Sequence, residues 1–198
     1  MKRSAGHVAV LAVVLALAGT LLSACATHEP APPPTAFRLS SPGMPDNTVF
    51  ARKYGGTNPK NPNCLGENVS PALEWVNPPE KTRSYVLLMD DQAGRNGLGV
   101  SHAVIYGIPA SARSLAEGEL SVPAQAGRFV AGKNTLGMQY LGPCPPRGNA
   151  LQHYVYTLIA TDLEPGALAP GLTKDEVLKA LQGGRALRGA SQVFRYAH

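Results

Sequence analysis

The sequence has 198 residues and a formal net charge of +5, from 18 Lys and Arg and 13 Asp and Glu. This length allows one domain or a tight pair of domains. Loss of an N-terminal segment that includes Lys2 and Arg3 would leave 16 basic and 13 acidic residues, a balance of +3. The basic residues are scattered instead of grouped with aromatic residues, which argues against a nucleic-acid groove.

The N-terminus has the pattern of a secretory signal peptide. Lys2 and Arg3 precede an apolar run over residues 8–22, and the small residues of "LSAC", residues 22–25, follow it. An uncleaved membrane anchor is the alternative, but about 15 apolar residues fall short of the ~20 that span a bilayer. We therefore expect residues 1–24 to be removed.

The "LSAC" stretch resembles the lipobox of bacterial lipoproteins, in which the cysteine is lipidated and becomes the first mature residue. The resemblance implies lipidation at Cys25 and firm anchoring, because stable attachment needs more than one acyl chain. Ala26 follows, where an aspartate would signal inner-membrane retention. The expected location is therefore the outer membrane, with the protein facing the periplasm.

Residues 25–36 are rich in proline and small residues and predict an extended tether behind the lipidated cysteine. The remaining chain, residues 37–198, is long enough to bury a sizeable core of its own. We therefore expect a single folded domain over this range.

Short extended segments dominate the folded part, with one late helix. Segments in which apolar and polar residues alternate, and short continuous apolar runs, predict strands. Turn residues without periodicity predict a long loop over 55–73. A capping box at Thr173 and Glu176 predicts a helix over 173–184. The strands are expected within residues 36–44, 46–54, 84–91, 101–109 and 153–162. This order indicates a mainly β (α+β) fold, a β-sandwich with a few peripheral helices and a C-terminal helix.

Two cysteines remain after Cys25. Cys64 and Cys144 form an even pair in an oxidising compartment, which favours a disulfide between them; two buried free thiols are the alternative. A metal site is not expected, because neither cysteine has a second Cys or His at ligand spacing.

Several motifs in this order resemble the phosphatidylethanolamine-binding protein family, in particular its bacterial Raf-kinase-inhibitor-like branch of the YbhB/YbcL type. The motifs are "GENVSPALEW" (66–75), a strand ending in "MDDQAG" (89–94), "SHAVIYGIP" (101–109), and "GPCPPRG" (142–148) followed by "HYVYTLIATD" (153–162). The resemblance covers nearly all of residues 37–198. It implies a central antiparallel β-sandwich with a small anion pocket at one end.

The resemblance also implies a set of ligand-binding residues. The acid of the first strand end corresponds to Asp90, although the prolines of the family motif are missing. Gln152 stands at a family histidine, and His153 should face the other side of its strand. The complete set is Asp90, His102, Gly142, Pro143, Gln152 and Tyr154.

The expected function is binding without catalysis and without a cofactor. The ligand would be a phosphate-bearing small molecule or a lipid headgroup, and a protein partner inhibited in the manner of some family members is possible by analogy only. The alternatives are a hydrolase that uses Ser101 and His102, whose side chains should face opposite sides of a strand, and an envelope adaptor with a vestigial pocket.

Overall fold

The computed structural model describes residues 33, 35–124, 127–137 and 139–198 of the chain. The expected signal peptide, the expected lipidation site Cys25 and nearly all of the expected tether lie outside these residues. Residues from Thr35 to His198 form one compact unit. No helix in the described part of the chain is both long and apolar enough to cross a membrane.

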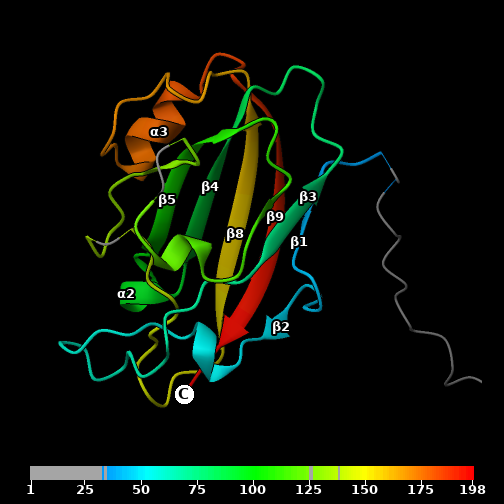
Figure 1. The fold of residues 1–198 in the computed structure, drawn as a ribbon. Helices are drawn as coiled ribbons and strands as arrows, with labels where there is room; N and C mark the ends of the chain where they lie inside the picture. The colour runs from blue at the N-terminus through cyan, green and yellow to red at the C-terminus, as the bar shows by residue number, and fades with distance from the viewer. Residues whose placement is uncertain (1–32, 34, 125–126, 138) are drawn as a thin grey trace, which may run out of the picture. The chain divides into compact units, whose positions relative to one another are not determined.

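Two sheets form the framework, as the strand patterns predict. The larger sheet has the order β2-β9-β8-β4-β5-β7 and is antiparallel except for the β2 and β9 pair. Its strands are β2 (Thr48–Val49), β9 (Ala186–Tyr196), β8 (Gln152–Thr161), β4 (Ser84–Asp91), β5 (Val100–Pro109) and β7 (Val130–Ala131). The smaller sheet has the order β1-β3-β6, with β1 (Arg38–Ser40), β3 (Leu73–Val76) and β6 (Ser114–Leu115). The fold is therefore a mainly β sandwich (Figure 1).

Each face of the larger sheet buries its own apolar cluster. Leu39, Trp75 and Leu115 of the smaller sheet pack with Tyr85 and Leu87 of β4 in the first cluster. Val86, Leu88, Val104, Val177 and Leu181 belong to the second, beneath helix α3 (Lys174–Ala180). Because β4 is covered on both faces, its side chains are buried without the apolar and polar alternation of a half-exposed strand.

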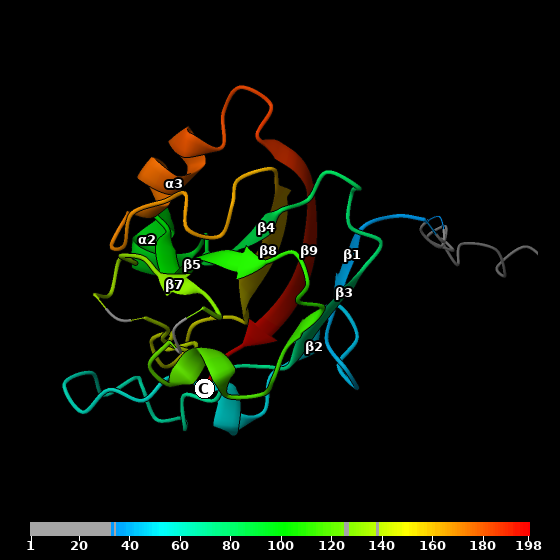
Figure 2. The ribbon, with the colours of Figure 1, turned by 45° about the horizontal axis from the view of Figure 1, so that its top comes forward.

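The predicted helix is confirmed, with a shorter extent. Thr173 and Glu176 form the capping box, with Glu176 N donating to Thr173 Oγ1 at 3.3 Å and Thr173 N to Glu176 Oε2 at 2.8 Å. The helix ends at Ala180, and Gly183 and Gly184 that follow it have positive φ angles of 71° and 85°. Strand β9 comes after it, so α3 is not the last element (Figure 2).

Among the described residues, three short helical turns lie in the connections, namely η1 (Arg52–Tyr54), α2 (Gly94–Gly97) and η2 (Glu119–Ser121). In Figure 1, α2 lies at the lower end of β4 and β5, the end toward which the long loop over 55–72 and the segment over 141–150 also run. The predicted disulfide between Cys64 and Cys144 is present and joins these two segments across a sequence separation of 80.

Candidate functional site

A cavity of about 210 Å³ opens at this end of the larger sheet. The ends of β4, β5 and β8 supply its polar side chains, while α2, the long loop and the segment after residue 140 supply its rim and walls. Its lining residues are Asn61, Asn63, Asp91, Gly94, Arg95, Val100, His102, Leu136, Leu141, Cys144, Pro145, Pro146, Gln152 and Tyr154.

The acid in this cavity is Asp91, and the prediction of Asp90 for that place is wrong. Asp91 lies directly opposite Tyr154 in the β4 and β8 ladder, so the two side chains share a face of the sheet. Its Oδ1 accepts hydrogen bonds from Ala93 N at 2.9 Å and from Gly94 N at 3.1 Å. Within the described residues Asp91 Oδ2 has no hydrogen-bonding partner, so it remains an acceptor for the cavity.

A β-bulge places the imidazole of His102 in the same cavity. Met89 pairs with Ala103, but the next β4 residue, Asp90, pairs with Ser101, so His102 is the extra residue of β5. Such a bulge re-aims side chains. His102 thus joins Asp91 in the cavity, while Ser101 lines another cavity together with Asp90.

The protonation of His102 follows from its contacts. Its Nδ1 lies 2.7 Å from the carbonyl oxygen of Leu141. Because a carbonyl oxygen only accepts, Nδ1 carries the proton in the neutral ring and Nε2 presents a lone pair. Burial lowers the pKa of His102, against opposing contributions from the Leu141 carbonyl and from Asp91. The ring is therefore neutral around pH 7.

Strand β8 contributes an amide and a phenol. Gln152 and Tyr154 alternate with the exposed His153, so both reach the cavity and His153 does not, as predicted. The Tyr154 hydroxyl donates to Gln152 Oε1 over a long 3.4 Å, and the Tyr154 and His102 rings meet edge to face at 5.3 Å. Burial raises the pKa of Tyr154, so its hydroxyl keeps its proton.

The rim adds donors that the sequence prediction did not include. Asn61 and Asn63 come from the long loop, and Arg95 comes from α2, where its φ of 52° is left-handed. Arg95 is exposed and lines a second cavity as well. It is the cation of this rim among the described lining residues.

Gly142 and Pro143, two of the predicted ligand-binding residues, do not line the cavity. Gly142 N donates to Asn68 Oδ1 at 2.8 Å, and Pro143 O accepts from Gly56 N at 2.8 Å. A Cβ on residue 142 would lie 2.2 Å from Tyr54 O. These residues therefore attach the proline segment to the long loop from behind, and Leu141, Cys144 and Pro145 form the wall.

Asp90 lies on the other face of β4. Its Oδ2 accepts a hydrogen bond from Lys174 Nζ at 2.8 Å, which ties the end of β4 to the start of α3. Ser101 lies on this face too, and its buried Oγ has no hydrogen-bonding partner among the described residues. Two faces of the same strand ends thus hold separate sets of polar groups.

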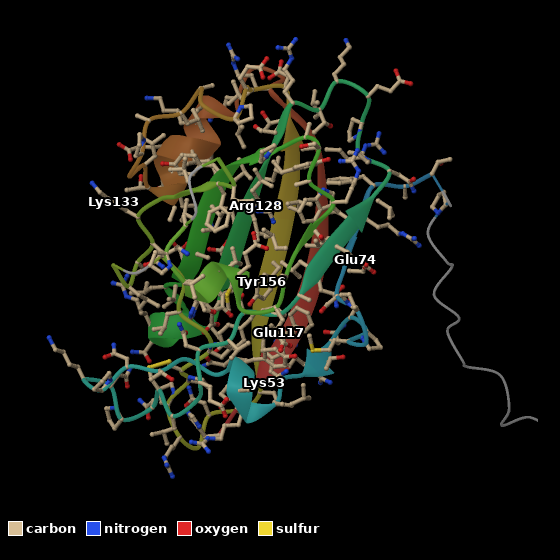
Figure 3. All side chains as sticks on the ribbon, in the orientation of Figure 1. Lys53, Glu74, Glu117, Arg128, Lys133 and Tyr156 are labelled. Atoms are coloured by element: carbon tan, nitrogen blue, oxygen red, sulfur yellow. A yellow bond between two sulfur atoms is a disulfide. The ribbon has the colours of Figure 1, made fainter. Side chains whose placement is uncertain are left out.

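A larger cavity of about 580 Å³, partly lined by Glu117 and Glu119, has its acids already paired. Lys53 Nζ donates to Glu117 at 2.9 Å, and Arg128 Nη2 donates to Glu119 at 2.6 Å. Figure 3 shows Lys53 and Glu117 close together, away from Lys133 at the α3 side. Across the described residues, no three His, Cys, Asp or Glu side chains are grouped as a metal site requires.

Comparisons with known proteins agree with this architecture. The sequence model of the family described as phosphatidylethanolamine-binding protein matches residues 40–194. A "UPF0098 protein" of Aquifex aeolicus is 37% identical over 150 residues, 74% of this chain and 86% of that protein. The protein named "Putative lipoprotein LppC" of Mycobacterium tuberculosis is 33% identical over 147 residues, 70% of this chain and 64% of that protein.

The crystal structure of Escherichia coli YbcL, described as a member of the mammalian PEBP family, has a similar fold. It superposes with a TM-score of 0.70 at 22% identity and covers 82% of this chain and 98% of that one. At this identity the likeness concerns the fold.

Proposed function

The chain belongs to the phosphatidylethanolamine-binding protein family, and from that premise we propose that it binds a small phosphate-like anion in the end cavity without turning it over. The anion could come from a soluble phosphate ester or from a lipid headgroup. The observation that carries the proposal is the convergence of His102, Gln152 and Tyr154 with the rim donors in one cavity.

The donors around the cavity suit an anion. Gln152 Nε2 has no hydrogen-bonding partner among the described residues, because the Tyr154 contact uses Oε1. The amides of Asn61 and Asn63 and the guanidinium of Arg95 add further donors at the rim. Arginine and amide donors are common partners of phosphate oxygens.

A binding role is favoured over hydrolysis by the direction of Ser101. A serine nucleophile needs its base within hydrogen-bonding reach, whereas Ser101 and His102 line different cavities. The cavity is also small and held by a disulfide and by backbone hydrogen bonds to Gly56, which suits a preformed receptor.

We further propose that the protein is anchored in the bacterial envelope through lipid on Cys25, facing the periplasm. Support comes from the lipobox-like "LSAC" stretch and from the similarity to the protein named a lipoprotein in Mycobacterium tuberculosis. The outer membrane is the proposed location because Ala26 replaces the inner-membrane retention residue. In this proposal, a protein partner at the membrane responds to ligand binding in the cavity.

The test is a calorimetric titration of the purified chain with methyl phosphate. Gln152→Ala should weaken binding about tenfold because it removes a donor to the anion, and His153→Ala should leave it unchanged because that neighbouring ring is exposed on the other side of β8. Turnover of the ester, or equal effects of the two variants, would contradict the proposal.

A further inference from the structure

The floor of the end cavity presents acceptors as well as donors. Asp91 Oδ2 is free of partners in the described part of the chain, because both backbone donors bind Oδ1. Neutral His102 offers the Nε2 lone pair, because its Nδ1 proton is committed to Leu141 O at 2.7 Å. A ligand that reaches this floor therefore meets two hydrogen-bond acceptors.

A fully ionised phosphate ester is poorly matched to such a floor. All the terminal oxygens of its dianion are acceptors, and two negative charges would lie near the Asp91 carboxylate. Like charges at short range in a partly buried site repel strongly. A ligand that carries one hydrogen-bond donor and one charge fewer avoids both penalties.

Resting on the proposed function, we propose that the cavity selects the singly protonated monoanion of a phosphate monoester. Its hydroxyl carries one proton, which it donates to one of the two acceptors, Asp91 Oδ2 or His102 Nε2. Gln152 Nε2 and the Arg95 guanidinium donate to its unprotonated oxygens. The protein thereby distinguishes monoesters from diesters and from sulfate by a proton that only the monoester can supply.

The other titratable and charged groups around His102 are consistent with a site in which the ligand, and not the ring, carries the proton. The titratable and charged lining groups are Asp91 on β4, Arg95 on α2 and Tyr154 on β8, and Asp90 acts on the ring from the opposite face of β4. Tyr154 keeps its proton because burial raises its pKa. Burial also lowers the pKa of His102, which disfavours the protonated ring.

The experiment compares three small probes by calorimetry between about pH 8 and pH 5, with the purified full chain. Methyl phosphate has a second pKa of about 6, so its affinity should rise about tenfold per pH unit from pH 8 toward pH 6.5 and level off below pH ~6. Sulfate and dimethyl phosphate, which carry no proton in this range, should bind at least about tenfold more weakly at the acid end.

A conservative variant locates the selectivity. Asp91→Asn keeps an oxygen for Ala93 N and Gly94 N but replaces the charged acceptor by a donor. It should strengthen sulfate binding and flatten the pH dependence for methyl phosphate. Asp90→Asn, on the other face of β4, is the matched control and should change neither.

Other results would overturn the inference in separable ways. Sulfate affinity that rises as the pH falls would mean that His102 takes up the proton. Methyl phosphate affinity that is independent of pH, or equally tight binding of a diester that bears an ammonium group such as glycerophosphoethanolamine, would contradict the need for the ester hydroxyl. Absence of binding by every probe, with the fold intact, would overturn the proposed function itself together with this inference.

Discussion

The end of the β4 and β5 pair has two polar faces that differ in how completely their groups are used. On the α3 face, Asp90 is paired with Lys174 at 2.8 Å and serves to hold the helix to the sheet. On the cavity face, Asp91 Oδ2 and His102 Nε2 have no partners among the described residues. Adjacent residues of one strand thus separate a structural ion pair from a candidate receptor, which shows that sequence proximity alone does not assign a role.

The largest effect is expected from removing the disulfide, which joins the long loop to the cavity wall at Cys144. Replacing both Cys64 and Cys144 by serine should lower the free energy of unfolding by about 4 kcal/mol, because the bridge closes a long loop of the unfolded chain. The midpoint of thermal unfolding should fall by roughly 10 °C. Denaturant unfolding of the oxidised wild type and of the variant measures this difference in free energy. Equal stabilities would contradict the claim that the disulfide stabilises the fold.

Gly142 tests whether the proline segment is attached from behind. A methyl group there would lie 2.2 Å from Tyr54 O, so Gly142→Ala should cost about 2 to 3 kcal/mol of stability. Gly166→Ala is the control, because no atom lies within 4 Å of the added Cβ. If the two variants are equally stable and Gly142→Ala loses only ligand binding, residue 142 belongs to the cavity after all.

The neutral state of His102 predicts a pH dependence of stability. Because burial lowers its pKa in the folded state, the unfolded chain binds the proton more readily. The stability that depends on the neutral His102 ring is fully present above the unfolded pKa of about 6.5. It is lost as the pH falls toward the folded pKa, at up to about 1.4 kcal/mol per pH unit. Urea unfolding from pH 8 to 5 should show this decline, and His102→Gln should lack that part of it. An unchanged slope in the variant would refute the assignment.

The ion pair on the α3 face should matter modestly and only for stability. The Asp90 and Lys174 side chains are 13% and 31% exposed, so their coupling energy should be about 1 kcal/mol. A double-mutant cycle with Asp90→Asn and Lys174→Met measures it. Weaker methyl phosphate binding in either single variant would contradict the claim that this pair is structural and takes no part in ligand binding.

Ser101 should give the smallest effect. Its buried Oγ has no hydrogen-bonding partner within the described residues, so Ser101→Ala should change stability by about 0 to 0.5 kcal/mol. Ser84→Ala, which removes a buried hydroxyl bonded to Leu163 O at 2.7 Å, should cost about 1 kcal/mol more. Any ester turnover abolished by Ser101→Ala would revive the hydrolase alternative.

The fold was largely predictable because its patterns are local. The apolar run of β4 matches Ser84–Asp91, and the capping box at Thr173 and Glu176 sets the start of α3. The end of α3 was less predictable, since the helix ends at Ala180, four residues before the end of the expected range 173–184.

The candidate site was predictable only in part, because it depends on pairing between strands. Alternation along β8 correctly assigned Gln152 and His153 to opposite sides. The choice between Asp90 and Asp91 was not accessible, because β4 is buried on both faces and carries no alternating signal. The bulge at His102 and the contact of Asn68 with Gly142 appear only once the strands and loops are placed.

The central claim is that the acceptors and donors of the end cavity receive a phosphate-like anion. The most direct measurement is the ¹⁵N chemical shifts of the histidine rings during a titration with methyl phosphate at pH 6. We predict that His102 Nε2 shifts with saturation, while His153, which is exposed on the other side of β8, does not change. A saturable shift confined to the exposed rings, or none at His102, would contradict the account.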